Sequence, residues 1–161
     1  MAKPRNAAGM GEEGLAGARI LIVEARFYDH IADILLAGAA RALTAAGAAF
    51  DRVSVPGALE IPIAIAIALD AAEGRGEPYD GVVALGCVIR GETSHYDIVA
   101  GESARGLMEL ALARRLPAGN GILTVDTEDQ ALARAEKWDK GGAAAKAALA
   151  LVALGRRLAA R

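Results

Sequence analysis

Cysteine and histidine are scarce in this chain, whose 161 residues include one cysteine, Cys87, and two histidines, His30 and His95. A single cysteine excludes a disulfide within the chain and is typical of a reducing compartment. These residues are not spaced as metal ligands are, so we expect no metal site. The sequence also lacks an apolar run long enough for a membrane span, and residues 1–17 lack the layout of a signal peptide. These absences predict a cytoplasmic protein that does not enter a membrane.

Large side chains and net charge are scarce as well. Aromatic residues make up 4% of the chain, whereas apolar residues make up 54%, much of it alanine. The formal net charge of −2 provides no general attraction for nucleic acid or an anionic membrane, so any anion site must be local. The length predicts one domain over residues 18–161, preceded by a glycine- and charge-rich segment, residues 1–17, that we expect to be disordered.

What the chain has in abundance is an alternation of short β-branched runs and longer helical patterns. Strands are predicted at residues 18–25, 50–56, 81–89 and 121–127. Helices are predicted at residues 30–46, with Asp29 as its cap, at 94–115, and over the remainder after the fourth strand, broken near "KWDKGG". Four strands alternating with helices predict an α/β fold with a four-stranded parallel sheet covered on both faces.

The segment "ALEIPIAIAIALDAA", residues 58–72, is compatible with two structures. Its isoleucines alternate as they would in a strand, but the residues between them are alanine rather than polar. The length of the segment, and the crossover that neighbouring parallel strands require, favour a buried helix with Pro62 in its first turn.

Ligands of open parallel sheets bind beyond the carboxyl ends of the strands, so the segments that follow each strand form the candidate site. They are "RFYD", "PGALE", "RGETSH" and "DTEDQ". The third is the most polar: Gly91 would allow a close backbone approach or a positive φ, and Ser94 and Asp97 have the spacing of a capping box. A helix that begins beside glycine is suited to bind phosphate. His95 falls in its first turn, where the helix dipole would favour a neutral imidazole that can carry protons.

A plainer interpretation is that Thr93 and Ser94 only cap the helix, that His95 is a solvated surface residue, and that Arg90 and Glu92 form a surface pair. Spacing alone does not separate the two interpretations. Other chemistry is easier to exclude. "GESARG" lies within a predicted helix and so is no nucleophile elbow, and the first strand is followed by no glycine, which argues against a nicotinamide cofactor.

Three blocks of the sequence resemble the lumazine synthase family: "VPGALEIP", "GCVIRGETSHYDIV" and "GILTVDTEDQALARA". The similarity runs from about Arg19 to the C-terminus. It implies a flavodoxin-like, three-layer α/β/α sandwich that forms pentamers, with active sites shared between adjacent subunits. It also implies an enzyme that condenses 5-amino-6-(ribitylamino)uracil with 3,4-dihydroxy-2-butanone 4-phosphate to 6,7-dimethyl-8-ribityllumazine, without a metal or organic cofactor.

The resemblance assigns a role to each site residue. His95 would be the acid/base, and the phosphate would be held by Gly91, Glu92 and Thr93, with Arg134 closing on it from the adjacent subunit. The pyrimidine and ribityl chain would contact Phe27, Ala58, Leu59, Glu60, Cys87, Val88, Ile89, Asn120 and Lys140, the last from the partner subunit.

The sequence departs from the family pattern at three places. Asn120 stands where many members have an aromatic before the fourth strand, and Tyr28 stands where asparagine is common. The junction from Arg134 to Lys140 is shorter than usual and lacks the "GNKG"-like segment of members that form sixty-subunit shells. The short junction favours a free pentamer or a pair of pentamers.

Two other functions are compatible with the same fold. A non-catalytic flavin or lumazine binder would use the same strand ends but would not need His95 beside Arg134. An oligomer with a purely structural role would form without turnover. Activity separates both from an enzyme.

Overall fold

The structure is a computed structural model that describes residues 14–161. The disorder expected for residues 1–17 therefore falls mostly on residues outside the described part. Within it, Leu15 is buried, and the guanidinium of Arg156 donates hydrogen bonds to the carbonyl oxygens of Gly14 and Ala16, at 2.7 and 3.0 Å. These contacts attach residues 14–17 to the C-terminal helix.

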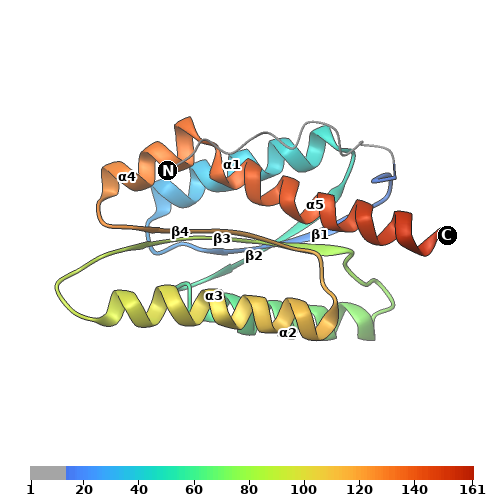
Figure 1. Ribbon diagram of the computed structural model, residues 1–161, viewed down its shortest axis with the longest axis horizontal. Helices are drawn as coiled ribbons and strands as arrows, with labels where there is room; N and C mark the ends of the chain where they lie inside the picture. The colour runs from blue at the N-terminus through green and yellow to red at the C-terminus, as the bar shows by residue number, and fades with distance from the viewer. Residues whose placement is uncertain (1–13) are drawn as a thin grey trace.

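Four parallel strands form one sheet at the centre of the molecule (Figure 1). They are β1 (Arg19–Ala25), β2 (Ala49–Val55), β3 (Gly81–Ile89) and β4 (Ala118–Val125), in the order β2-β1-β3-β4. Strand β2 lies at one edge, β1 lies next to it, and β3 and β4 follow on the other side of β1. This is the strand order of flavodoxin-like folds. The predicted parallel α/β sheet is confirmed.

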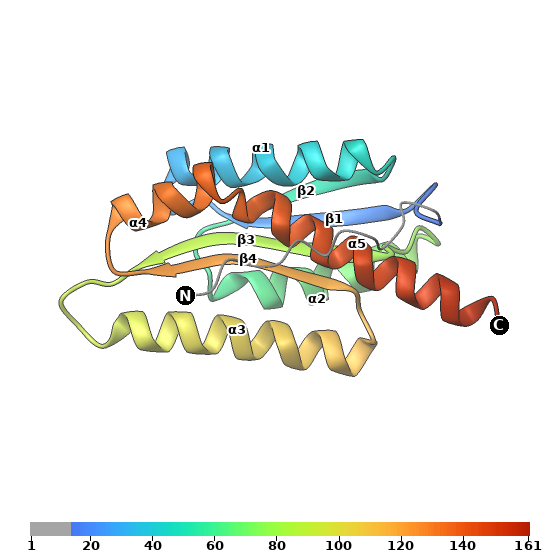
Figure 2. The ribbon, with the colours of Figure 1, turned by 45° about the horizontal axis from the view of Figure 1, so that its top comes forward.

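The helices lie in two layers, one on each face of the sheet (Figures 1 and 2). One layer holds α1 (Asp29–Ala45), α4 (Glu128–Leu132) and α5 (Lys140–Ala159), and a π-helical turn, Ala133–Lys137, joins the last two. The other layer holds α2 (Glu60–Gly74) and α3 (His95–Arg114). The isoleucine-rich segment is thus a helix with Pro62 in its first turn, and the break predicted near "KWDKGG" is present. None of the helices in residues 14–161 is both long and apolar enough to cross a membrane.

The core consists of two apolar clusters, one on each side of the sheet. Strands β1 and β3, in the middle of the sheet, are almost entirely buried, as expected for a parallel sheet covered on both faces. Glycines allow α5 to pack closely against α1 and β4. A Cβ added at Gly141 would lie 2.0 Å from the carbonyl oxygen of Leu35 in α1, and one at Gly119 would lie 1.9 Å from that of Ala144.

Three predictions about the ends of elements were wrong for physical reasons. Strand β4 begins at Ala118 rather than at residue 121, because Gly119 and Gly121 act as contact points for α5 and do not break the strand. The same strand ends at Val125, and Thr127 caps α4 by accepting a hydrogen bond from the backbone N–H of Gln130. Asp29 is the first residue of α1 and not its cap, since its carboxylate accepts a hydrogen bond from Arg26 Nε at 2.9 Å.

Candidate active site

A cavity of about 300 Å³ lies where β1, β2 and β3 end. Its walls come from the three segments that follow these strands and from the first turns of α2 and α3. It is lined by Phe27, Tyr28, Gly57, Ala58, Leu59, Glu60, Cys87, Val88, Ile89, Gly91, Thr93, His95, Tyr96 and Val99. Parallel strands bring their carboxyl ends to one edge of the sheet, which is why segments distant in sequence meet here.

The wall of this cavity offers an aromatic face and a carboxylate. Phe27 is the second residue after β1, and its side chain is 73% exposed. A large apolar ring left in solvent beside a cavity is a surface on which a planar ligand can stack. Glu60 begins α2, and its Oε2 lies 3.0 Å from the position that a Cβ would take at Gly57. Glycine at position 57 therefore leaves room for this carboxylate at the cavity.

The floor of the cavity is less reactive than its polar rim. Burial raises the pKa of the Cys87 thiol to about 11, and the negative charge of Glu128 adds to the effect. Burial likewise raises the pKa of Tyr28, with smaller contributions from Cys87 and Glu128. Both groups are therefore neutral at pH 7, and Cys87 serves as a wall of the cavity rather than as a nucleophile.

The loop between β3 and α3 forms the polar rim. Within the described part of the chain, the backbone N–H groups of Gly91, Glu92, Thr93 and Ser94 have no hydrogen-bond acceptor, and the next N–H, that of His95, contacts Thr93 Oγ1 at 3.3 Å. Exposed N–H groups in a row at the start of a long helix are an anion site. No added Cβ atom at Gly91 would meet a neighbour within 4 Å, and its φ is not positive. The sequence predicted that Gly91 allows either a positive φ or a close approach of the backbone to a ligand, and only the close approach is compatible with this geometry.

The predicted capping box is absent, because Asp97 makes a different contact. Its carboxylate faces Arg90 at 3.4 Å, and Ser94 makes no side-chain capping bond. Arg90 also binds Asp126 at 3.1 Å and lies 4.1 Å above the ring of Tyr96, so its partner is not Glu92. Arg90 thus joins the ends of β3 and β4 to the first turn of α3 and holds both ends of the polar loop.

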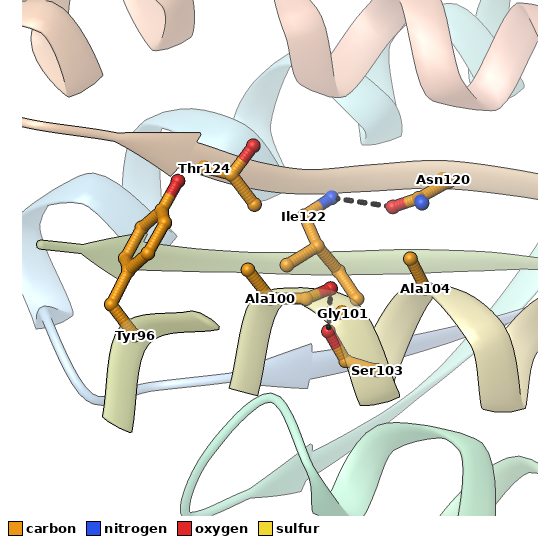
Figure 3. Close-up of a pocket in the computed structure, with 8 residues that line it drawn as sticks. All are labelled: Tyr96, Ala100, Gly101, Ser103, Ala104, Asn120, Ile122 and Thr124. Carbon is orange, nitrogen blue, oxygen red and sulfur yellow. Dashed lines mark hydrogen bonds between the residues drawn. The ribbon is translucent and has the colours of Figure 1, made fainter. Parts of the chain in front are cut away.

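Four predicted site residues do not line this cavity: Glu92, Asn120, Arg134 and Lys140. Asn120 lines a second cavity of about 350 Å³, on the outer edge of the sheet between β4 and α3 (Figure 3). There Asn120, Ile122 and Thr124 face the small residues of α3, and Asn120 Oδ1 accepts a hydrogen bond from the backbone N–H of Ile122 at 2.9 Å. Arg134 lies in the π-helical turn and Lys140 at the start of α5.

Several lining residues were not predicted from the sequence. Tyr96 and Val99 follow His95 by one and four residues, so the helical repeat of α3 could have placed Val99 beside His95. Gly57 was noted only as the end of a strand, and Tyr28 only as a departure from a family pattern. None of these four carries a polar pattern of its own, which is why sequence reasoning passed over them.

The fold and the cavity together define a parallel α/β protein with a cavity at the carboxyl ends of its strands. A family model described as 6,7-dimethyl-8-ribityllumazine synthase matches residues 17–156. The chain belongs to this family.

Relatives that carry this family's name cover nearly the whole chain. The 6,7-dimethyl-8-ribityllumazine synthase of Rhodopseudomonas palustris (strain BisA53) is 61% identical over 161 residues, which is 99% of each chain. That of Azorhizobium caulinodans is 63% identical over 159 residues, or 98% of each chain. That of Methylorubrum extorquens (strain PA1) is 66% identical over 146 residues, 89% of this chain and 84% of its own.

Proposed function

We propose that this protein is a transferase that condenses 5-amino-6-(ribitylamino)uracil with 3,4-dihydroxy-2-butanone 4-phosphate. The product is 6,7-dimethyl-8-ribityllumazine, and phosphate and water are released. This is the penultimate step of riboflavin biosynthesis. The observation that carries the proposal is the position of His95 beside a row of unpaired backbone N–H groups at one cavity.

The pyrimidine binds between Phe27 and the first turn of α2. Phe27 stacks on the ring, because its face is exposed at the cavity. The uracil edge and the ribityl hydroxyls meet Ala58, Leu59 and Glu60, whose carboxylate accepts hydroxyl hydrogen bonds. Cys87, Val88 and Ile89 form the apolar wall behind them.

The phosphate binds at the β3–α3 loop. Gly91, Glu92 and Thr93 provide backbone N–H groups, and Thr93 adds its hydroxyl. Arg134 reaches the phosphate and Lys140 the pyrimidine from the adjacent subunit. Support for this division is that neither of them lines the cavity of its own chain.

His95 carries the protons of the reaction. Imine formation, phosphate elimination and ring closure each need a proton added or removed, and a neutral imidazole can do both.

The protein acts as a homo-oligomer in the cytoplasm, a pentamer or a multiple of it. Support comes from the outer surface of α2 and α3, where large apolar side chains are 54–72% exposed: Ile63, Ile67, Ile98, Met108 and Leu112. Exposed apolar side chains in such number are typical of a surface that another subunit covers. The short junction after Arg134 favours a pentamer or a decamer over a closed shell.

Turnover by the purified protein tests the proposal. Both substrates are mixed with the protein, and the absorbance and fluorescence of the lumazine product are followed. Product should form well above the uncatalysed rate, and His95→Ala should slow turnover by roughly 10²–10⁴-fold, the usual contribution of a positioned acid/base. Arg134→Ala should instead raise KM for the phosphorylated substrate, because a charge-assisted contact is lost.

Background-rate product from both wild type and His95→Ala would contradict the enzyme assignment. If tight flavin binding were retained in that case, the protein would be a binder on the same fold. An unchanged rate in His95→Ala, with wild-type turnover intact, would remove His95 from the mechanism and leave the reaction assignment standing.

A further inference from the structure

Trp138 lies within cation–π distance of the two cationic side chains that the proposed site requires. The Cζ of Arg134 is 4.9 Å from the centroid of its ring, and the Nζ of Lys140 is 5.9 Å from it. Trp138 is the only tryptophan of the chain, and its side chain is 47% exposed. A cation over the face of an indole is attracted by the ring's quadrupole, so this ring draws both side chains to one place.

The backbone at this point brings the groups together. Trp138 follows the π-helical turn Ala133–Lys137, and its N–H donates to the carbonyl oxygen of Ala133, five residues back, at 3.2 Å. Turns of this kind inside helices occur frequently at functional sites. Asp139 then adopts a positive φ of 44°, and α5 begins at Lys140 (Figure 1). The short junction from Arg134 to Lys140 therefore turns around the tryptophan.

Neither cation is neutralised by a carboxylate. Across residues 14–161, no aspartate or glutamate oxygen lies within 4 Å of the charged nitrogens of Arg134 or Lys140. Arg134 Nη1 donates to the carbonyl oxygen of Gln130, at 3.1 Å, which leaves most of its guanidinium N–H groups free. The indole ring is neutral, so it attracts each cation without cancelling the positive charge that attracts an anion.

We propose that Trp138 is a positioning residue that holds Arg134, and with it Lys140, ready for the phosphate-bearing substrate. This inference rests on the phosphate-binding role of Arg134 under the proposed function. Phosphate is a stronger partner than a neutral ring, because it accepts charge-assisted hydrogen bonds from the guanidinium. Binding of phosphate draws Arg134 from the indole and changes the environment of the only tryptophan.

The first experiment uses that tryptophan as the probe. The wild-type protein is titrated with inorganic phosphate, with sodium chloride at the same ionic strength as the reference, while the indole emission is recorded. We expect a saturable change with phosphate, absent with chloride and absent in Arg134→Gln. The same response to phosphate and to chloride in the wild type would overturn the proposal, because phosphate would then leave the contact between Arg134 and the ring unchanged.

The second experiment separates positioning from structural support. Trp138→Leu should raise KM for the phosphorylated ketone by roughly 2- to 5-fold, the loss expected for one exposed cation–π contact. The kcat and the KM for the pyrimidine should change little, and Trp138→Phe should restore most of the loss. Leu158→Ala, which removes an exposed apolar side chain elsewhere on α5, serves as the matched control.

The role of Trp138 and the proposed function fail under different results. If Trp138→Leu lowers kcat and affects both substrates equally, or if Trp138→Phe restores nothing, Trp138 does not position Arg134. If the wild type shows no turnover, the proposed function fails, while the phosphate titration still tests the contact between Trp138 and Arg134.

Discussion

At the scale of single residues, the most unusual group is Glu24, a carboxylate without solvent exposure near the carboxyl end of β1. It accepts hydrogen bonds from Arg26 Nη1 at 3.0 and 3.1 Å and from Ser54 Oγ at 3.0 Å, and Arg52 Nε lies 2.9 Å away. Ser54 is the residue directly paired with Glu24 on the neighbouring strand. A buried charge is tolerated only when partners replace the lost water, and here three side chains do so.

Glu24→Gln tests the importance of this cluster. The amide keeps the shape of the side chain but places N–H donors against arginine donors, so we expect the free energy of unfolding to fall by about 1–3 kcal/mol. Urea denaturation at pH 7 and fixed chain concentration measures it. The control is Glu102→Gln, in which an exposed carboxylate loses its bonds to Arg105, with an expected loss below about 0.5 kcal/mol. Equal losses in the two variants would contradict the argument.

Cys87 should behave as a buried thiol. Its pKa is raised to about 11, so the thiol is neutral at pH 7 and becomes a reactive thiolate only as the pH approaches that value. Alkylation by iodoacetamide should therefore accelerate roughly tenfold for each pH unit between pH 7 and pH 10. A rate that levels off near pH 8.5, the ordinary range of a solvated thiol, would show that burial does not control this group.

At the scale of elements, two glycines of α5 have opposite predicted effects. Gly141 meets the backbone of α1, where a Cβ would be 2.0 Å from an oxygen, whereas Gly155 has no neighbour within 4 Å of the same position. Gly141→Ala should lower the free energy of unfolding by about 1–3 kcal/mol, because α5 must shift from α1. Gly155→Ala should raise it by about 0.5–1 kcal/mol, since alanine loses less backbone entropy in a helix.

Thermal unfolding of the two variants at one protein concentration measures the difference. The change in chemistry is the same at both positions, so only the packing distinguishes them. Destabilisation by Gly155→Ala, or tolerance of Gly141→Ala, would mean that α5 does not pack on α1 as described.

At the scale of the whole molecule, large apolar side chains remain exposed over α2 and α3. Ile67 is 65% exposed and Met108 61%, although both lie in the middle of long helices. These side chains contribute nothing to the core of one chain. Contact with another subunit would remove them from water and complete the proposed site with Arg134 and Lys140.

Ile67→Asp should therefore interfere with assembly without unfolding the chain. We expect sedimentation equilibrium to give a mass of five chains or a multiple of five for the wild type, and a smaller assembly for the variant, because a charge buried in an interface is costly. Leu158→Asp places the same charge on the opposite layer and should leave the mass unchanged. A wild-type mass near sixty chains would contradict the free pentamer or decamer, and a single-chain mass would contradict the shared active site.

The sequence alone determined the alternation of strands and helices, the parallel sheet, and most of the cavity. Apolar periodicity is local, and the residues that follow parallel strands must meet at one edge, so Phe27, Ala58, Glu60 and His95 were predicted to share the cavity they line. Cys87, within β3, was predicted as a lining residue only through the family resemblance. The start of β4 was predicted too late because of its glycines. Gly119 makes a packing contact with Ala144 of α5, 25 residues further along the chain, and no local pattern shows this contact.

The tertiary structure alone decided which groups partner one another. Arg90 binds Asp126, which follows β4, and not the nearby Glu92. Glu24 meets Ser54 through the register of two strands, and a π-helical turn precedes Trp138, which lies within cation–π distance of Arg134 and Lys140. Side-chain partners depend on distances in space, and those are set by strand register and helix packing over the whole chain. Local propensity contains no information on them, because the same short segment can be placed against many different neighbours.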